Sequence, residues 1–171
     1  MYVDGTVCRN HHRRIGICWK GKSPSRRWRC LQARRRLALM EINWDLLRSE
    51  ALGAMKKAYA PYSKFPVGVA ALVDDGRIIT GCNVENASYG LTLCAECGLI
   101  SSLIASGGGR LIAFACVDIA GNPLMPCGRC RQLLQEHGGS KLQMDTNEGI
   151  KTLGDLLPWA FGPEEMNERL S

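Results

Sequence analysis

The chain has 171 residues, of which 46% are hydrophobic, enough for one domain with a buried core. Its formal net charge of +6 is uneven: residues 1–39 carry 11 Lys and Arg against Asp4, a net of +10, so residues 40–171 carry −4. Residues 1–39 have no apolar run of about seven or more residues, and nothing in the chain approaches the roughly 18 apolar residues of a membrane span, so we expect neither a secreted nor a membrane protein.

Residues 1–39 are rich in Arg pairs and have no sustained apolar periodicity, so we expect them to be largely disordered. Their composition would suit a transit peptide or loose nucleic-acid binding. At Met40 the composition changes abruptly to that of a folded domain. This change favours a third interpretation, in which residues 1–39 are an over-extended start without function and residues 40–171 form the catalytic domain.

Residues 40–171 contain three helical and four strand-like patterns. Asn43 predicts a helix cap, and Asp74-Asp75-Gly76 predicts a hairpin turn. The nearly continuous apolar run at 111–119 predicts a strand covered on both faces. In chain order we expect a helix to about Ala58, strands 67–73 and 77–84, a helix from 94, strand 111–119, a helix over 127–137 and strand 142–145. This order predicts an α/β sandwich around one mixed sheet.

Two cysteine motifs lie at predicted helix starts, Cys94-Ala95-Glu96-Cys97 and Pro126-Cys127-Gly128-Arg129-Cys130, with 29 residues between Cys97 and Cys127. Three thiolates can hold Zn²⁺ and leave its fourth position to water. Glu96, two residues after the first ligand, can then carry protons beside that water. The pattern is typical of zinc-dependent nucleobase deaminases and predicts Cys94, Cys127 and Cys130 as the ligands.

The same cysteines also form two Cys-x-x-Cys pairs, which would suit a closed, non-catalytic zinc module with four thiolate ligands. The 29 residues between the pairs exceed the usual 15 to 20 of such modules. Glu96 and Pro126 together favour the catalytic site. Since the other cysteines of this region lie in strand-like runs, we expect a reduced, cytoplasmic protein.

Residues 41–163 resemble the small homotetrameric cytidine deaminases of pyrimidine salvage. The resemblance implies a three-layer α/β sandwich with a mixed sheet of about five strands and helices on both faces. It also implies one Zn²⁺ per subunit and active sites shared between subunits. The segments that carry it are Ala60–Gly68, Gly81–Tyr89, Pro126–Gln132 and Leu156–Pro163.

The resemblance also assigns substrate-binding residues. It implies that Phe65 packs on the pyrimidine ring and that Asn83 and Glu85 hydrogen-bond the ribose 3′-hydroxyl. Ala95 would also contact the substrate, and Phe161 would come from a neighbouring subunit to cover the base.

Cys97 departs from the family's sequence pattern, because most members carry Arg directly after the catalytic Glu. That Arg offsets the negative charge of three thiolates and Glu96. Here Arg129 or Arg131 could replace it, the helix dipoles could suffice, or Cys97 could act as a neutral thiol donor.

The resemblance implies hydrolysis of cytidine and 2′-deoxycytidine to uridine and 2′-deoxyuridine plus ammonia. An aminonucleoside-antibiotic deaminase of the blasticidin type is the nearest alternative, and it ranks second because Asn83 and Glu85 favour a ribose. A polynucleotide-editing deaminase is disfavoured because a region of net charge −4 is a poor surface for phosphate backbones.

Overall fold

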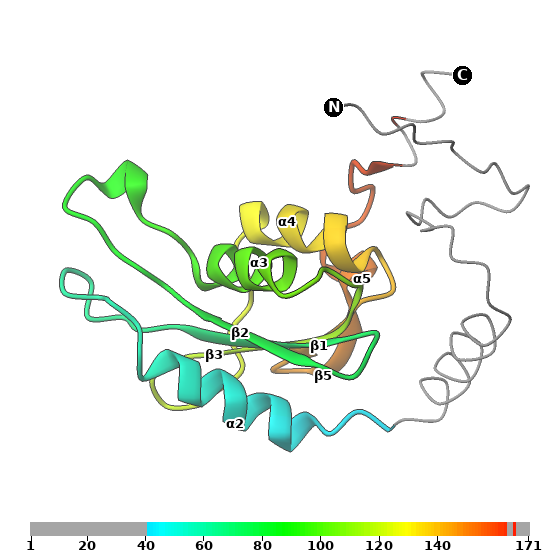
Figure 1. Ribbon diagram of the computed structural model, residues 1–171, viewed down its shortest axis with the longest axis horizontal. Coiled ribbons are helices and arrows are strands. Elements are labelled where there is room, and N and C mark those ends of the chain that lie inside the picture. The colour runs from blue at the N-terminus through cyan, green and yellow to red at the C-terminus, as the bar shows by residue number, and fades with distance from the viewer. Residues whose placement is uncertain (1–40, 164–165, 167–171) are drawn as a thin grey trace, which may run out of the picture. The chain divides into compact units, whose positions relative to one another are not determined.

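In a computed structural model of the chain, the structure describes residues 41–163 and 166. They form one five-stranded mixed sheet with α2 on one face and α3, α4 and α5 on the other (Figure 1), which confirms the predicted sandwich. The strands are β1 Gly68–Val73, β2 Ile78–Cys82, β3 Leu111–Val117, β4 Gln143–Thr146 and β5 Gly149–Thr152, in the order β2-β1-β3-β4-β5. The helices are α2 Trp44–Met55, α3 Ala95–Ala105, α4 Gly128–Gly138, α5 Leu153–Leu156 and the 3₁₀ helix η1 Tyr89–Leu91.

The prediction for residues 1–39 lies outside the described residues. Within the described part, no helix is both long enough and apolar enough to span a bilayer.

Helix α2 begins as predicted, with the side-chain oxygen of Asn43 accepting the N–H of Leu46 at 2.9 Å. It ends at Met55, earlier than the predicted Ala58, and the N–H of Tyr59 then donates to the Asn83 carbonyl at 3.1 Å. The chain therefore leaves the helix to pair with the segment that follows β2.

The predicted hairpin is confirmed as β1 and β2, which pair antiparallel. Strand β3 pairs antiparallel with β1 and parallel with β4, which makes the sheet mixed. Its side chains alternate between the two layers: Phe114 and Cys116 pack in the cluster with α3, whereas Ala113 and Ala115 pack in the cluster with α2. Strand β3 is therefore covered on both faces, as its apolar run predicts.

Strand β5 and helix α5 were not identified from their own residues. Strand β5 is a four-residue edge strand whose one large apolar side chain, Ile150, is 41% exposed, so no alternating pattern marks it. Helix α5 is a single turn, held by a capping box between Thr152 and Asp155. Both elements are too short to show a periodic apolar pattern.

Candidate active site

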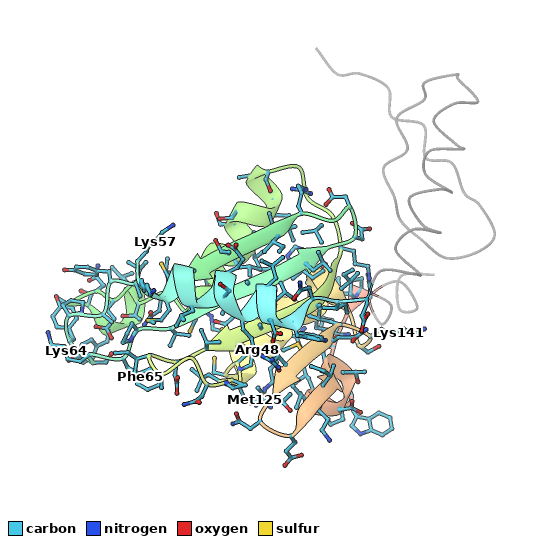
Figure 2. All side chains as sticks on the ribbon, turned by 90° about the horizontal axis from the view of Figure 1, so that it is seen from below. Arg48, Lys57, Lys64, Phe65, Met125 and Lys141 are labelled. Atoms are coloured by element: carbon cyan, nitrogen blue, oxygen red, sulfur yellow. The ribbon has the colours of Figure 1, made fainter. Side chains whose placement is uncertain are left out.

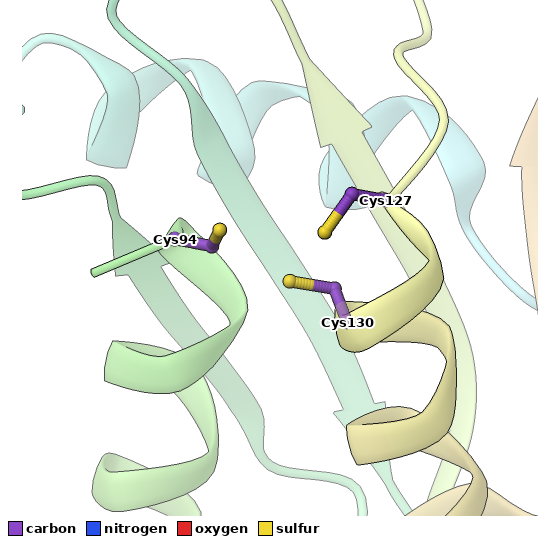
Figure 3. Close-up of side chains that lie close together, drawn as sticks. All are labelled: Cys94, Cys127 and Cys130. Atoms are coloured by element: carbon purple, nitrogen blue, oxygen red, sulfur yellow. The ribbon is translucent and has the colours of Figure 1, made fainter. Parts of the chain in front are cut away.

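The N-terminal ends of α3 and α4 bring three cysteines together (Figure 3). Cys94 immediately precedes α3, Cys127 immediately precedes α4, and Cys130 lies in the first turn of α4. Their sulfur atoms all lie within 4.8 Å of one another. Three sulfurs bound tetrahedrally to Zn²⁺ would lie about 3.8 Å apart, from Zn–S bonds of about 2.3 Å. The donor type and its spacing therefore fit one zinc ion.

Cys97 is not part of this group. Among the described residues, Cys94, Cys127 and Cys130 make up the set whose atoms lie close enough to hold a metal ion. Cys97 instead lines a groove between α3 and α4, together with Ile100, Arg129 and Leu133. The geometry therefore disfavours the closed four-thiolate module.

The three thiols differ in their electrostatic surroundings. The main-chain N–H groups of Cys130 and Arg129 lower the pKa of Cys127, against its burial. Burial raises the pKa of Cys94 and, together with the charge of Glu96, that of Cys130. The protein alone therefore disfavours three adjacent thiolates, and a divalent cation would supply the charge that stabilises them.

In place of the missing Arg, other groups must offset the negative charge of the cysteine thiolates and Glu96. The structure supports the N–H groups at the N-terminal end of α4 in this role. The N–H groups of Cys130 and Arg129 contribute to the lowered pKa of Cys127. The Arg131 guanidinium donates elsewhere, to the carbonyls of Pro126 at 2.9 Å and Leu156 at 3.0 Å. Arg131 thus fixes the chain before Cys127 by binding its backbone.

Glu96 is one of the few buried ionisable residues, with 4% of its surface exposed. It lies in the first turn of α3, and its carboxyl raises the pKa of Cys130 both by its charge and by a side-chain hydrogen bond. Its carboxyl therefore lies beside the cysteine group. The side chain of Ala95 packs in the core, so only its main chain can face a ligand.

Residues 83–85 connect the metal site to the segment that contains Phe65. Val84 and Leu93 exchange hydrogen bonds of 3.0 and 2.9 Å, directly before Cys94. On the other side, Tyr59 pairs with Asn83 and Glu85 at 3.1 and 2.8 Å. Since Phe65 follows Tyr59 by six residues, this backbone pairing brings the predicted base-binding and ribose-binding segments next to the first predicted metal ligand.

The side chains of Asn83 and Glu85 hold the segment 62–67, a role that sequence reasoning missed. The Asn83 side chain accepts from the N–H of Val67 at 2.8 Å and donates to the Phe65 carbonyl at 3.0 Å. The Glu85 carboxylate accepts from the N–H of Tyr62 at 2.8 Å. Phe65 itself is 49% exposed and lies beyond the C-terminal end of α2 (Figure 2).

Both polar side chains keep hydrogen-bonding capacity for a ligand. A side-chain amide has two donors and two acceptor lone pairs, and the described bonds of Asn83 use one of each. A carboxylate has about four acceptor positions. Their contacts with the segment 62–67 orient Asn83 and Glu85 without saturating them, as a binding role for a sugar hydroxyl requires.

Phe161 lies near α4, where the Gln132 side chain donates to its carbonyl at 2.7 Å. Its side chain is 55% exposed, and that of Trp159 is fully exposed. Residues 159–161 therefore present aromatic surface beside the second cysteine motif. The predicted role of Phe161 in a neighbouring subunit's site stays a prediction.

The chain is similar to known proteins in sequence and in fold. Residues 43–146 match the family model of the cytidine and deoxycytidylate deaminase zinc-binding region. The chain is 60% identical over 126 residues to a cytidine deaminase of Mycobacterium tuberculosis, covering 74% of this chain and 95% of that protein. It is 42% identical over 129 residues to a cytidine deaminase of Halalkalibacterium halodurans, covering 72% of this chain and 98% of that protein. The crystal structure of cytidine deaminase from Mycobacterium leprae has a TM-score of 0.68 and 63% identity, covering 69% of this chain and 99% of that one.

Proposed function

The chain belongs to the cytidine deaminase family, and from that membership we propose how its residues divide the work of the reaction. The protein is a zinc-dependent hydrolase that deaminates cytidine. We extend this activity to 2′-deoxycytidine, with uridine or 2′-deoxyuridine and ammonia as products, in pyrimidine salvage. The observation that supports the chemistry is the group of three cysteine sulfurs with the buried Glu96 carboxyl beside it.

Cys94, Cys127 and Cys130 would hold the zinc ion. When bound, zinc supplies the Lewis acidity that ionises a water molecule near neutral pH. The helix-terminal N–H groups that lower the pKa of Cys127 favour the thiolate form of that ligand. Cys97, which lies outside the sulfur group in the groove between α3 and α4, would not hold the metal.

Glu96 moves the protons. It takes one from the attacking water and gives it to N3 of the pyrimidine, while the oxygen forms a bond to C4. It then takes the remaining hydroxyl proton and gives it to the amino group as the C4–N4 bond breaks and ammonia leaves. A carboxyl suits this task because it can accept a proton and release it again within one site.

The nucleoside is recognised at both of its ends. Phe65 stacks on the pyrimidine ring, and Asn83 and Glu85 use their remaining donor and acceptor positions for the 3′-hydroxyl of the ribose. If Asn83 and Glu85 bind the ribose, the enzyme turns over cytidine and discriminates strongly against free cytosine, which has no ribose. Comparing these two compounds and blasticidin S tests the assignment, and a preference for the antibiotic would favour the alternative activity.

We infer that the enzyme works as a homotetramer in the cytoplasm, with active sites shared between subunits. Large apolar side chains on the segment after β2 are exposed, among them Tyr89 at 76% and Leu91 at 66%. Exposed apolar groups of this kind are typical of subunit interfaces. Light scattering after gel filtration should give four times the 18.8 kDa of one chain. A monomer with full activity would contradict the shared sites.

Replacement of Cys97 tests the open zinc site. Cys97→Ser should keep one zinc per subunit and a kcat for cytidine within about threefold of the wild type, because the sulfur lies outside the group of three. Zinc content, kcat and X-ray absorption are measured on the same samples. A variant that gains activity over an inert wild type would show that Cys97 is a fourth ligand.

A further inference from the structure

Ser63 connects the two parts of the nucleoside site. Its hydroxyl oxygen accepts the N–H of Phe65 at 3.0 Å. Its own N–H donates to the Glu85 carboxylate at 3.2 Å. One residue therefore links the main chain of the base-stacking residue to the carboxylate assigned to the ribose.

We propose that Ser63 is a positioning residue for the deamination reaction, which fixes Phe65 relative to Glu85 and so couples stacking of the base to recognition of the sugar. This inference rests on the roles proposed for Phe65 and Glu85. Ser63 itself needs no contact with the substrate.

The backbone around Ser63 shows why such a link is needed. Lys64, between Ser63 and Phe65, has a φ of +58°, a left-handed conformation that residues with a side chain rarely adopt. Such a conformation persists where the surroundings hold it. The Phe65 side chain is 49% exposed, so core packing does little to hold it. The hydrogen bonds at Ser63, Asn83 and Glu85 hold this segment, together with the bond from the Lys64 N–H to the Ala60 carbonyl at 3.2 Å.

The charge state of Glu85 supports the same arrangement. The nearby Ser63 hydroxyl lowers the pKa of Glu85, and burial opposes this shift. The N–H groups of Tyr62 and Ser63 and the charge of Lys64 lower the pKa further. Glu85 is thus held as a carboxylate, the form that accepts a hydrogen bond from a sugar hydroxyl.

Substitution of Ser63 in the full-length protein tests the proposal. Ser63→Ala should lower kcat/KM for cytidine by about 10-fold, mainly through a higher KM, because the N–H of Phe65 loses its hydrogen-bond acceptor. Ser63→Thr keeps the hydroxyl and should stay within about threefold of the wild type. Ser140→Ala is the matched control: Ser140 directly precedes Lys141, which lies at the opposite end of the folded unit from Phe65 (Figure 2). Zinc content and the thermal midpoint should be unchanged in all three variants.

A double-mutant cycle separates positioning from a general structural effect. In a Phe65→Ala background, Ser63→Ala should cost less than about twofold, because its effect passes through the Phe65 ring. Wild-type kinetics of Ser63→Ala, a Thr variant as impaired as the Ala variant, or an undiminished effect in the Phe65→Ala background would each overturn the proposal. These outcomes concern Ser63 alone as long as the wild type deaminates cytidine. A wild type inert toward cytidine would overturn the proposed function instead, and with it the role of Ser63.

Discussion

Glu96→Gln should lower kcat for cytidine by about 10³-fold, because an amide cannot take up and release the transferred proton. The amide has nearly the same size as the carboxyl and does not ligate the metal in the proposed site. Fold, assembly and zinc content should therefore be retained. The measurement is kcat by ultraviolet absorbance together with zinc per subunit.

Glu50→Gln is a matched control, since Glu50 is an exposed residue of α2, on the other face of the sheet. It should have wild-type kinetics. If Glu96→Gln retained kcat within a few-fold of the wild type, Glu96 would not be the proton carrier. If it lost zinc as well as activity, Glu96 would have to be assigned a role in holding the metal.

Cys127→Ala should abolish turnover through loss of the metal. Removal of one of three thiolates leaves two protein ligands, fewer than catalytic zinc sites use. Cys127 is exposed and lies outside the two core clusters, so the substitution should leave the packing of the fold intact. Zinc content should fall well below one per subunit, and activity at limiting zinc should fall at least about 10³-fold.

Cys97→Ser is the matched control for this variant, because it removes a thiol from the same region but from outside the sulfur group. Chelator treatment should lower the thermal midpoint of the wild type and of Cys97→Ser, and change that of Cys127→Ala little. If Cys127→Ala retained zinc and turnover while Cys97→Ser lost both, the ligand assignment would be wrong.

The fold was predictable where elements carry long periodic patterns or clear end signals. Asn43 marks the start of α2, and the apolar run of β3 marks a central strand covered on both faces. The four-residue β5 and the single turn of α5 were not predictable, because Ile150 is half-exposed and such short segments show no period. The early end of α2 depends on the pairing of Tyr59 with Asn83, which is distant in sequence.

The grouping of the three cysteines was predictable because they lie in two short motifs at helix starts, and helix ends fix where their side chains point. The structure brings Cys94, Cys127 and Cys130 together and excludes Cys97, which motif spacing alone left open. The hydrogen bonds by which Asn83 and Glu85 hold the segment 62–67 were not predictable. They depend on a loop 16 to 23 residues earlier in the chain that folds back onto the strand end. Ser63 was missed for the same reason.

Ultraviolet-monitored turnover of cytidine by the purified full-length protein, with zinc measured on the same sample, tests the central claim most directly. With one zinc per subunit, the protein should convert cytidine to uridine with release of one ammonia per molecule, and Glu96→Gln should nearly abolish the conversion. A folded, zinc-loaded wild type that leaves cytidine unchanged would contradict an open catalytic site. It would favour the alternative, a closed zinc module with four thiolate ligands.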